Sequence, residues 1–364
     1  MRCPNCNETE HEPTAKFCHN CGWEFGKVFG KPKNKTPNFT FAESFSEGMA
    51  MVGIGEHAGF IDKTGTVVIE PRYNPSSSYS FGYDIRNGFS EGLAAVSINK
   101  YPIVMYGCID RHGIFVILPQ YDVVWPFSEG LAPVLLSDQW GFIDKDGRVV
   151  VDPQYRGVKG FSEGLAAVEL EYQHYVYIDK TGRIAIQNAN RRFCKSNLEW
   201  ANDFHDGLAA VECDGIKGYI NKSGRFFKTK FDFNGDFSEG LAVVGVGYNL
   251  EGYIDTNMNT VIKPQFDEAK DFHEGMAAVR KGSDWGYINT SGNLVIPFQF
   301  NKAAPFSEGL AAVEQNGKLG YVDKQGNMVI SPRFREARGF SEGMAAVEEN
   351  NRWGFIDKTG NYAF

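Results

Sequence analysis

The sequence lacks the features that mark membrane, secreted and nucleic-acid-coating proteins. It has no uninterrupted apolar run of the roughly 18 residues that a membrane helix needs, and it begins Met1-Arg2-Cys3-Pro4 without the apolar segment of a secretory signal. Neither sign of charge dominates, since 37 Lys and Arg stand against 45 Asp and Glu, a net charge of −8. An acidic chain is poorly suited to bulk nucleic-acid binding. These absences predict a cytoplasmic protein that does not bind membranes.

A recognisable catalytic pattern is also missing. The seven His form no metal pair such as H-E-x-x-H, and Gly245-x-Gly247 lacks the third Gly and the following helix of a phosphate-binding loop. The Asp and Glu residues that could act as acids or bases belong to a repeated pattern. We therefore expect no enzyme and no catalytic residues.

Glycine and phenylalanine are abundant, with 41 Gly and 29 Phe. A Phe-Ser-Glu-Gly tetrad, or a close variant, recurs with a period of about 34 residues, and such a period is typical of repeat architectures. The nine tetrads begin at Phe45, Phe89, Phe127, Phe161, Phe204, Phe237, Phe272, Phe306 and Phe340. We expect these Phe side chains to staple neighbouring units. We expect the Ser and Glu to satisfy turn donors, although the repeated Glu could instead form an acidic stripe.

Each repeat predicts three short strands. In one clean unit, residues 310–314 and 319–323 are apolar runs separated by a hairpin turn signal. A second turn, Asp323 to Gly326, leads to a third run that stops at Pro332. No unit supplies the helical periodicity that a helical repeat would need. The sequence therefore predicts an all-β fold of nine tandem, three-stranded antiparallel meanders over residues 37–364.

Two arrangements of these units fit the sequence. The units could stack as an open or spiral, solenoid-like array, or close into a propeller-like ring in which the N-terminal segment completes the last unit. Propellers typically have four to eight blades of four strands. Nine three-stranded units therefore favour the open array.

Three units carry a Trp-Gly pair at the head of the second strand: Trp140-Gly141, Trp285-Gly286 and Trp353-Gly354. With the following Tyr/Phe-Ile-Asp and turn Gly, they resemble the WG (KWG) repeat of bacterial proteins over essentially all of 37–364. The resemblance implies a β-rich interaction module. Because most units lack the Trp, the fold tolerates its absence. These three side chains could therefore be partly exposed and contact a partner, or they could pack half-buried against the array.

The strongest chemical motif lies before the repeats. Cys3-x2-Cys6 and Cys18-x2-Cys21 have the spacing of a closed four-thiolate site, the structural type for one Zn²⁺, although a redox dithiol pair or an iron–sulfur centre would use the same residues. The segment is similar to short bacterial zinc ribbons. We expect a zinc ribbon over 1–25 and a Lys-rich flexible linker over 26–36. Reduced thiolates favour a reducing compartment, and nucleic acid remains possible only through the ribbon.

Insertions interrupt the repeat at 74–87, 99–106 and 187–203, and insertions in repeat proteins often form the binding face. They supply further contact candidates, namely Tyr101, Tyr106, Arg191, Arg192 and Trp200. The sequence thus predicts a non-enzymatic scaffold that binds a protein partner through the array, with the ribbon as an accessory module. The alternatives are a carbohydrate or cell-envelope binder, and an enzyme with its site in the insertions.

Overall fold

The computed structural model describes residues 38–74, 88–100, 103–187, 197–247 and 250–364. The zinc ribbon, its four cysteines, the linker, Tyr101, Arg191 and Arg192 lie outside these ranges and stay predictions. Across the described ranges the fold is all-β, with no helix, as the sequence predicts. It follows that these ranges hold no helix long and apolar enough to cross a membrane.

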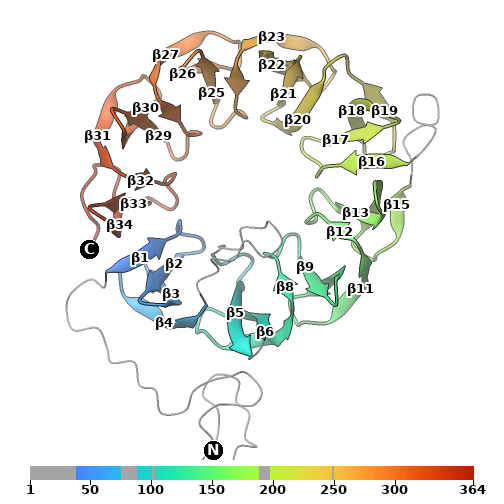
Figure 1. The fold of residues 1–364 in the computed structure, drawn as a ribbon, viewed down its shortest axis with the longest axis horizontal. Coiled ribbons are helices and arrows are strands. Elements are labelled where there is room, and N and C mark those ends of the chain that lie inside the picture. Colours follow the sequence, from blue (N-terminus) through green and yellow to red (C-terminus); the bar gives the residue numbers. More distant parts are fainter. Residues whose placement is uncertain (1–37, 75–87, 101–102, 188–196, 248–249) are drawn as a thin grey trace, which may run out of the picture.

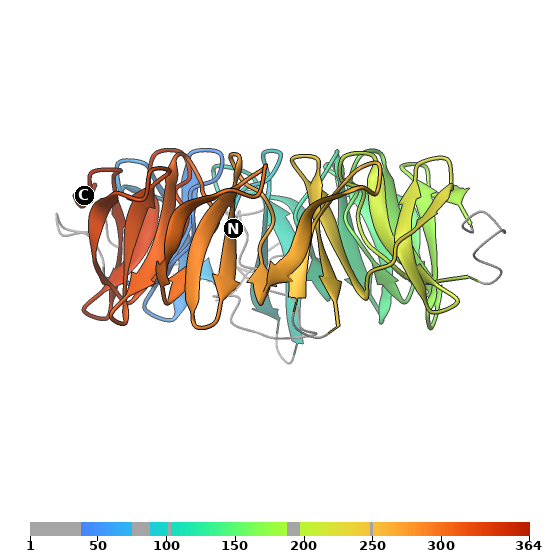
Figure 2. The same cartoon turned by 90° about the horizontal axis from the view of Figure 1, so that it is seen from above.

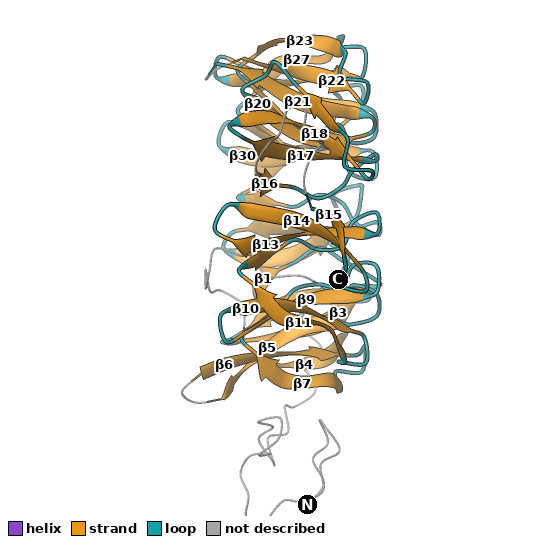
Figure 3. Ribbon diagram, turned by 90° about the vertical axis from the view of Figure 1, so that its right-hand side faces the viewer, coloured by secondary structure: helices purple, strands orange, loops and turns teal. Residues whose placement is uncertain are grey.

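One repeat forms one blade, a sheet of four strands. In the eighth unit β29 (Leu310–Gln315), β30 (Lys318–Asp323) and β31 (Met328–Phe334) form the predicted antiparallel meander. The segment that leads into the tetrad adds a short fourth strand, β28 (Lys302–Ala303), which pairs with β29. Figure 3 shows strands of this kind throughout the described chain.

The other blades follow the same order. Their strands are, in blade 1, β1 (Phe39–Ala42), β2 (Met49–Ile54), β3 (His57–Asp62) and β4 (Val67–Tyr73); in blade 2, β5 (Ala94–Lys100), β6 (Ile103–Ile109) and β7 (Phe115–Tyr121); in blade 3, β8 (Val123–Val124), β9 (Leu131–Leu136), β10 (Gln139–Asp144) and β11 (Val149–Tyr155); and in blade 4, β12 (Gly157–Val158), β13 (Leu165–Glu171), β14 (His174–Asp179) and β15 (Ile184–Ile186). They continue, in blade 5, as β16 (Leu198–Ala201), β17 (Leu208–Cys213), β18 (Ile216–Asn221) and β19 (Phe226–Lys228); in blade 6, as β20 (Phe233–Ser238), β21 (Leu241–Val246), β22 (Leu250–Asp255) and β23 (Thr260–Phe266); in blade 7, as β24 (Glu268–Ala269), β25 (Met276–Lys281), β26 (Asp284–Asn289) and β27 (Leu294–Phe300); and in blade 9, as β32 (Glu336–Ala337), β33 (Ala345–Glu349) and β34 (Arg352–Ile356).

The blades are arranged as a ring, with the last strand of each meander, such as β23, β27 and β31, at the outer rim (Figure 1). The opposite edge of each sheet, formed by strands such as β20, faces the centre. Seen from the side, all blades stand at one height (Figure 2). Successive units therefore rotate about the ring axis without a rise along it.

The first and last blades meet at a seam that closes this ring. β1 pairs with β34 at Phe39 and Trp353, and the Ser341 hydroxyl donates to the Phe45 carbonyl oxygen at 2.7 Å, as the Ser307 hydroxyl donates to Phe340 at 2.6 Å within the array. The nine meanders are confirmed, but the favoured open array is corrected to the ring alternative. In an open array the Ser341 hydroxyl and the Phe45 carbonyl oxygen would not meet. Here they form the same hydrogen bond that links neighbouring blades elsewhere in the array.

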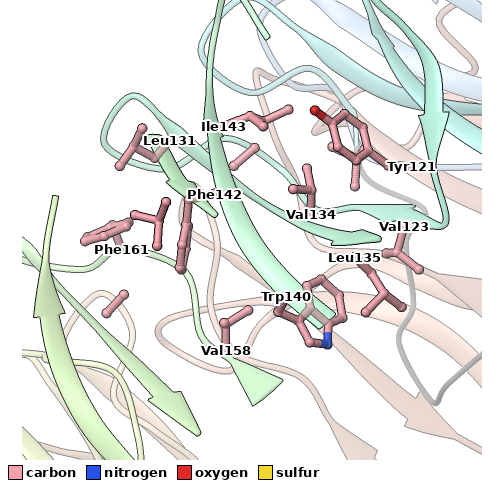
Figure 4. Close-up of a cluster of buried hydrophobic side chains, with 14 of the residues drawn as sticks. Tyr121, Val123, Leu131, Val134, Leu135, Trp140, Phe142, Ile143, Val158 and Phe161 are labelled. Atoms are coloured by element: carbon pink, nitrogen blue, oxygen red, sulfur yellow. The ribbon is translucent and has the colours of Figure 1, made fainter. Parts of the chain in front are cut away.

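The tetrad Phe side chains form the core between blades, as predicted. Eight of the nine pack on an aromatic ring from the second meander strand of the preceding blade, with ring centroids 4.9 Å apart for Tyr287 and Phe306 and for Phe142 and Phe161. For Phe127 the corresponding position is Cys108, which lies in the same core cluster. Figure 4 shows the latter pair with Trp140 among the apolar side chains of blades 3 and 4. At the seam, Phe45 and Phe355 repeat this geometry at 4.9 Å. One packing rule therefore holds around the ring.

The Gly of the Trp-Gly pair is required by the close approach of the third strand. A Cβ at Gly320 would lie 2.4 Å from the carbonyl oxygen of Ile330, where the pairing of β30 with β31 shifts register. Blade 4 carries Val176 at this position, and its third strand, β15, ends after three residues. The Gly thus permits the long bulged strand that most blades use.

Two of the remaining cysteines are described, and they differ. Cys108 is buried with a free thiol, as expected. Cys213 is buried and disulfide-bonded, although the sequence was expected to hold only free thiols there.

Candidate functional site

The repeated Glu side chains link each blade to the next. The Glu308 carboxylate accepts a hydrogen bond from the Gly343 N–H at 3.0 Å and pairs with Lys358 at 3.1 Å. The same link runs from Glu47 to Gly92, Glu91 to Gly130, Glu129 to Gly164, Glu163 to Gly207, Asp206 to Gly240, Glu239 to Gly275, Glu274 to Gly309 and, across the seam, Glu342 to Gly48. The carboxylates serve the fold, as predicted, and do not form a free acidic stripe.

These contacts also set the acidity of the tetrad carboxylates. Partial burial disfavours the charged form of Glu308, but the hydrogen bonds from Lys358 and Gly343 outweigh it and hold the pKa below its usual value. Glu91 and Glu342 behave alike. The carboxylates of Glu91, Glu308 and Glu342 are therefore ionised at neutral pH.

Blades 5, 6 and 7 differ from the others in the residue that precedes the tetrad. There, and in no other unit, an Asp directly precedes the tetrad Phe, at Asp203, Asp236 and Asp271. Burial, together with the nearby charge of Asp236, raises the pKa of Asp203 and of Asp271. No group of three His, Cys, Asp or Glu among the described residues is placed to hold a metal ion. We name Asp203, Asp236 and Asp271 the acidic arc.

Most of the predicted contact residues that the structure describes are not on the surface. Trp140 and Trp285 are 4% and 7% exposed and belong to the core, and Tyr106 is also buried. Trp353 is half-buried against the seam, with the Arg338 guanidinium 5.6 Å from its ring centroid. The Trp of the Trp-Gly pair is thus a packing residue, which is one of the two roles that the sequence left open, and the alternative role as a partner contact is not borne out.

Trp200 is the predicted contact residue that lies in a groove. The groove has a volume of about 470 Å³ and runs across blades 4, 5 and 6. Trp200 is 40% exposed there, and Tyr172 and Phe233 add aromatic rings that are 73% and 48% exposed. We call these three side chains the aromatic trio. Large aromatic side chains gathered in one concavity are typical of a binding site.

The repeat explains why the trio gathers. Trp200 and Phe233 each stand four residues before a tetrad Phe, so they occupy the same position on β16 and β20, the inner strands of neighbouring blades. Blades 7 and 8 have Glu268 and Lys302 at that position. Tyr172 joins them from the turn between β13 and β14. Aligning the units by their tetrads could have revealed Phe233, but nothing in the sequence pointed to Tyr172.

Polar groups line the rest of the groove. Glu169 accepts from the Gln173 N–H at 3.0 Å, and Glu199 accepts from the Gly215 N–H at 3.1 Å. Lys217 lies 4.0 Å from Glu212, so the groove holds three carboxylates and one ammonium group. Asn234 is 5% exposed, and its side-chain amide nitrogen has no hydrogen-bond partner.

Comparisons with solved structures give the fold. A crystal structure described as "the eukaryotic initiation factor" is 11% identical and has a TM-score of 0.58, covering 91% of this chain and 93% of that one. The computationally designed Ika8 protein is 10% identical with a TM-score of 0.47, over 89% and 97%. BamB from Moraxella catarrhalis is 12% identical with a TM-score of 0.40, over 72% and 91%. The search of curated proteins found no match.

The family comparison covers most of the array. The family described as "WG containing repeat" matches residues 36–56, 59–74, 106–139, 140–172, 218–249, 252–283, 285–318 and 320–353. These segments make up more than half of the sequence, and the long ones each run from the second meander strand of one blade to the first hairpin of the next. The chain therefore belongs to the WG containing repeat family.

Proposed function

We propose that the ring is a non-enzymatic scaffold that binds a protein partner through the groove across blades 4 to 6. The observation that carries this proposal is the aromatic trio, three exposed aromatic rings gathered in one concavity. Tyr and Trp dominate the binding energy of protein interfaces because they bury large areas at low entropic cost. In this proposal the protein is bacterial and cytoplasmic, and the N-terminal zinc ribbon adds a second recognition module.

A carbohydrate is the second candidate ligand. Aromatic faces beside carboxylates, with the buried amide of Asn234, could also hold a sugar ring and its hydroxyl groups. The groove is nevertheless assigned first to a protein, because it spans three blades rather than forming one enclosed pocket.

Affinity capture with the full chain tests this assignment. Wild-type bait is compared with a Trp200→Ala/Phe233→Ala variant and with Tyr362→Ala, a matched control that removes a ring exposed to 46% on blade 9. We expect one protein to be retained by the wild type and the control and lost from the groove variant. Retention by all three baits, or recovery of polysaccharide alone, would contradict the proposal.

A further inference from the structure

We propose that the groove holds an arginine side chain of its partner, and so recognises an arginine-containing peptide segment. This inference rests on the proposed function and specifies the chemistry of the partner. It follows from the charge of the groove, from the open face of Trp200 and from the unpaired amide of Asn234.

The charge of the groove is unbalanced. Lys217 stands beside Glu212, whereas Glu169 and Glu199 are met by backbone N–H groups alone. Among the described residues, no cation pairs with either of these two carboxylates. A side chain that brings one positive charge would therefore improve the electrostatic balance of the groove, and an acidic ligand would worsen it.

The indole face of Trp200 is open, whereas cations lie over the rings of Trp285 and Trp353. The Arg280 guanidinium lies 5.9 Å and the Lys270 ammonium 5.3 Å from the Trp285 ring centroid, and Arg338 covers Trp353. Within the described part of the chain no cation covers Trp200. An external cation can take that place, and a guanidinium is the better candidate because it stacks flat on indole while its N–H groups reach carboxylates.

Two further features favour a peptide over a free cation. The unpaired amide of Asn234 lines the groove, and a peptide carbonyl is an acceptor that such a group can bond. Asp203 and Asp236 stand three residues beyond Trp200 and Phe233 along the chain, a span of about 10 Å in extended backbone. An extended segment with a second basic residue could reach the acidic arc from the groove.

Peptide titration of the full chain tests the inference. The probes are four eight-residue peptides, alternating Gly with Arg, Lys, citrulline or Glu, and binding is measured by fluorescence anisotropy at low salt. We expect the Arg peptide to bind about tenfold more tightly than the citrulline peptide, which keeps the shape but lacks the charge, and more tightly than the Lys peptide. Affinity should fall as salt is added. Equal binding of the Arg and citrulline peptides would overturn the inference.

Matched variants locate the site. Trp200→Ala and Glu199→Gln should each weaken binding of the Arg peptide about fivefold or more. Asp267→Asn is the control, because Asp267 accepts from the Gly282 N–H in blade 7 as Glu199 accepts from Gly215 in blade 5. Equal losses in Glu199→Gln and Asp267→Asn would refute the groove as the site. Thermal melts of each variant confirm that it is folded.

The outcomes separate this inference from the proposed function. If the groove variant loses its captured protein but no Arg peptide binds, the arginine assignment is wrong and the scaffold function stands. If the Arg peptide binds in the groove but all baits capture the same proteins, the protein-scaffold function fails. Binding of a neutral oligosaccharide in place of the Arg peptide overturns the arginine assignment.

Discussion

The seam between blades 9 and 1 is what separates a ring from an open array, and a pair of matched substitutions tests it. Glu342 accepts from the Gly48 N–H with both oxygens at 3.0 Å and pairs with Lys63 at 2.9 Å, across the two ends of the repeat array. Glu308 makes the same contacts with Gly343 and Lys358 inside the array. In a ring, Glu342→Ala and Glu308→Ala should destabilise the protein equally.

The expected loss of folding free energy follows from the contacts that each substitution removes. A hydrogen bond to a charged group contributes about 1.5–3 kcal/mol, and a half-exposed ion pair adds at most about 1 kcal/mol. Because the Gly48 N–H is only partly buried, water can recover part of the loss, and we expect about 2 kcal/mol for each variant. Glu342 and Glu308 both have positive φ, 54° and 53°, so backbone strain from the Ala cancels in the comparison.

Urea unfolding of the full-length variants, followed by circular dichroism, measures both losses. Equal shifts of the midpoint with an unchanged slope are the expected result. If Glu342→Ala unfolded like the wild type while Glu308→Ala lost about 2 kcal/mol, the seam would be open in solution and the ring would be wrong.

Three further predictions concern the seam, the tetrad carboxylates and the zinc ribbon. Phe364 packs on Phe355 with ring centroids 5.8 Å apart and lies against Gly65 across the seam. Phe364→Ala should therefore lower the free energy of unfolding by about 2 kcal/mol. Tyr362→Ala should lower it less in the same assay, because the Tyr362 ring is 46% exposed. In the folded protein the pKa values of Glu91, Glu308 and Glu342 lie below the usual 4.5, so these groups take up protons first in the unfolded chain as the pH falls. Unfolding titrations should therefore show full stability above the unfolded pKa and a loss of stability as the pH falls through the folded pKa values. An increase in stability on acidification to pH 3 would contradict this. Mass spectrometry under native conditions should find one zinc ion per chain, and the Cys3→Ser/Cys6→Ser variant should lose it without a change in the melting temperature of the ring. An iron–sulfur absorption band, or a wild-type chain without zinc, would refute the zinc ribbon.

The repeat unit could be derived from the sequence because its determinants are local. Turn residues such as Asp323 and Gly326, and the apolar runs between them, set the meander within about 34 residues. The tetrad Phe and Glu could be assigned to structural roles because a residue present in every unit serves every unit. The sequence left the roles of Trp140 and Trp285 open between packing and partner contact, because no single unit shows that the surrounding structure buries them.

The three-stranded meander, the order of its strands and the nine repeats were therefore determined by the sequence itself, whereas the short fourth strand that pairs with the meander emerged only from the structure. Ring closure was decided by the tertiary structure, because it depends on the small rotation between blades, summed over nine junctions, and no single unit encodes that sum. The groove was decided in the same way. Tyr172, Trp200 and Phe233 lie on three blades, and only the packing of those blades brings their rings, the surrounding carboxylates and Asn234 into one concavity.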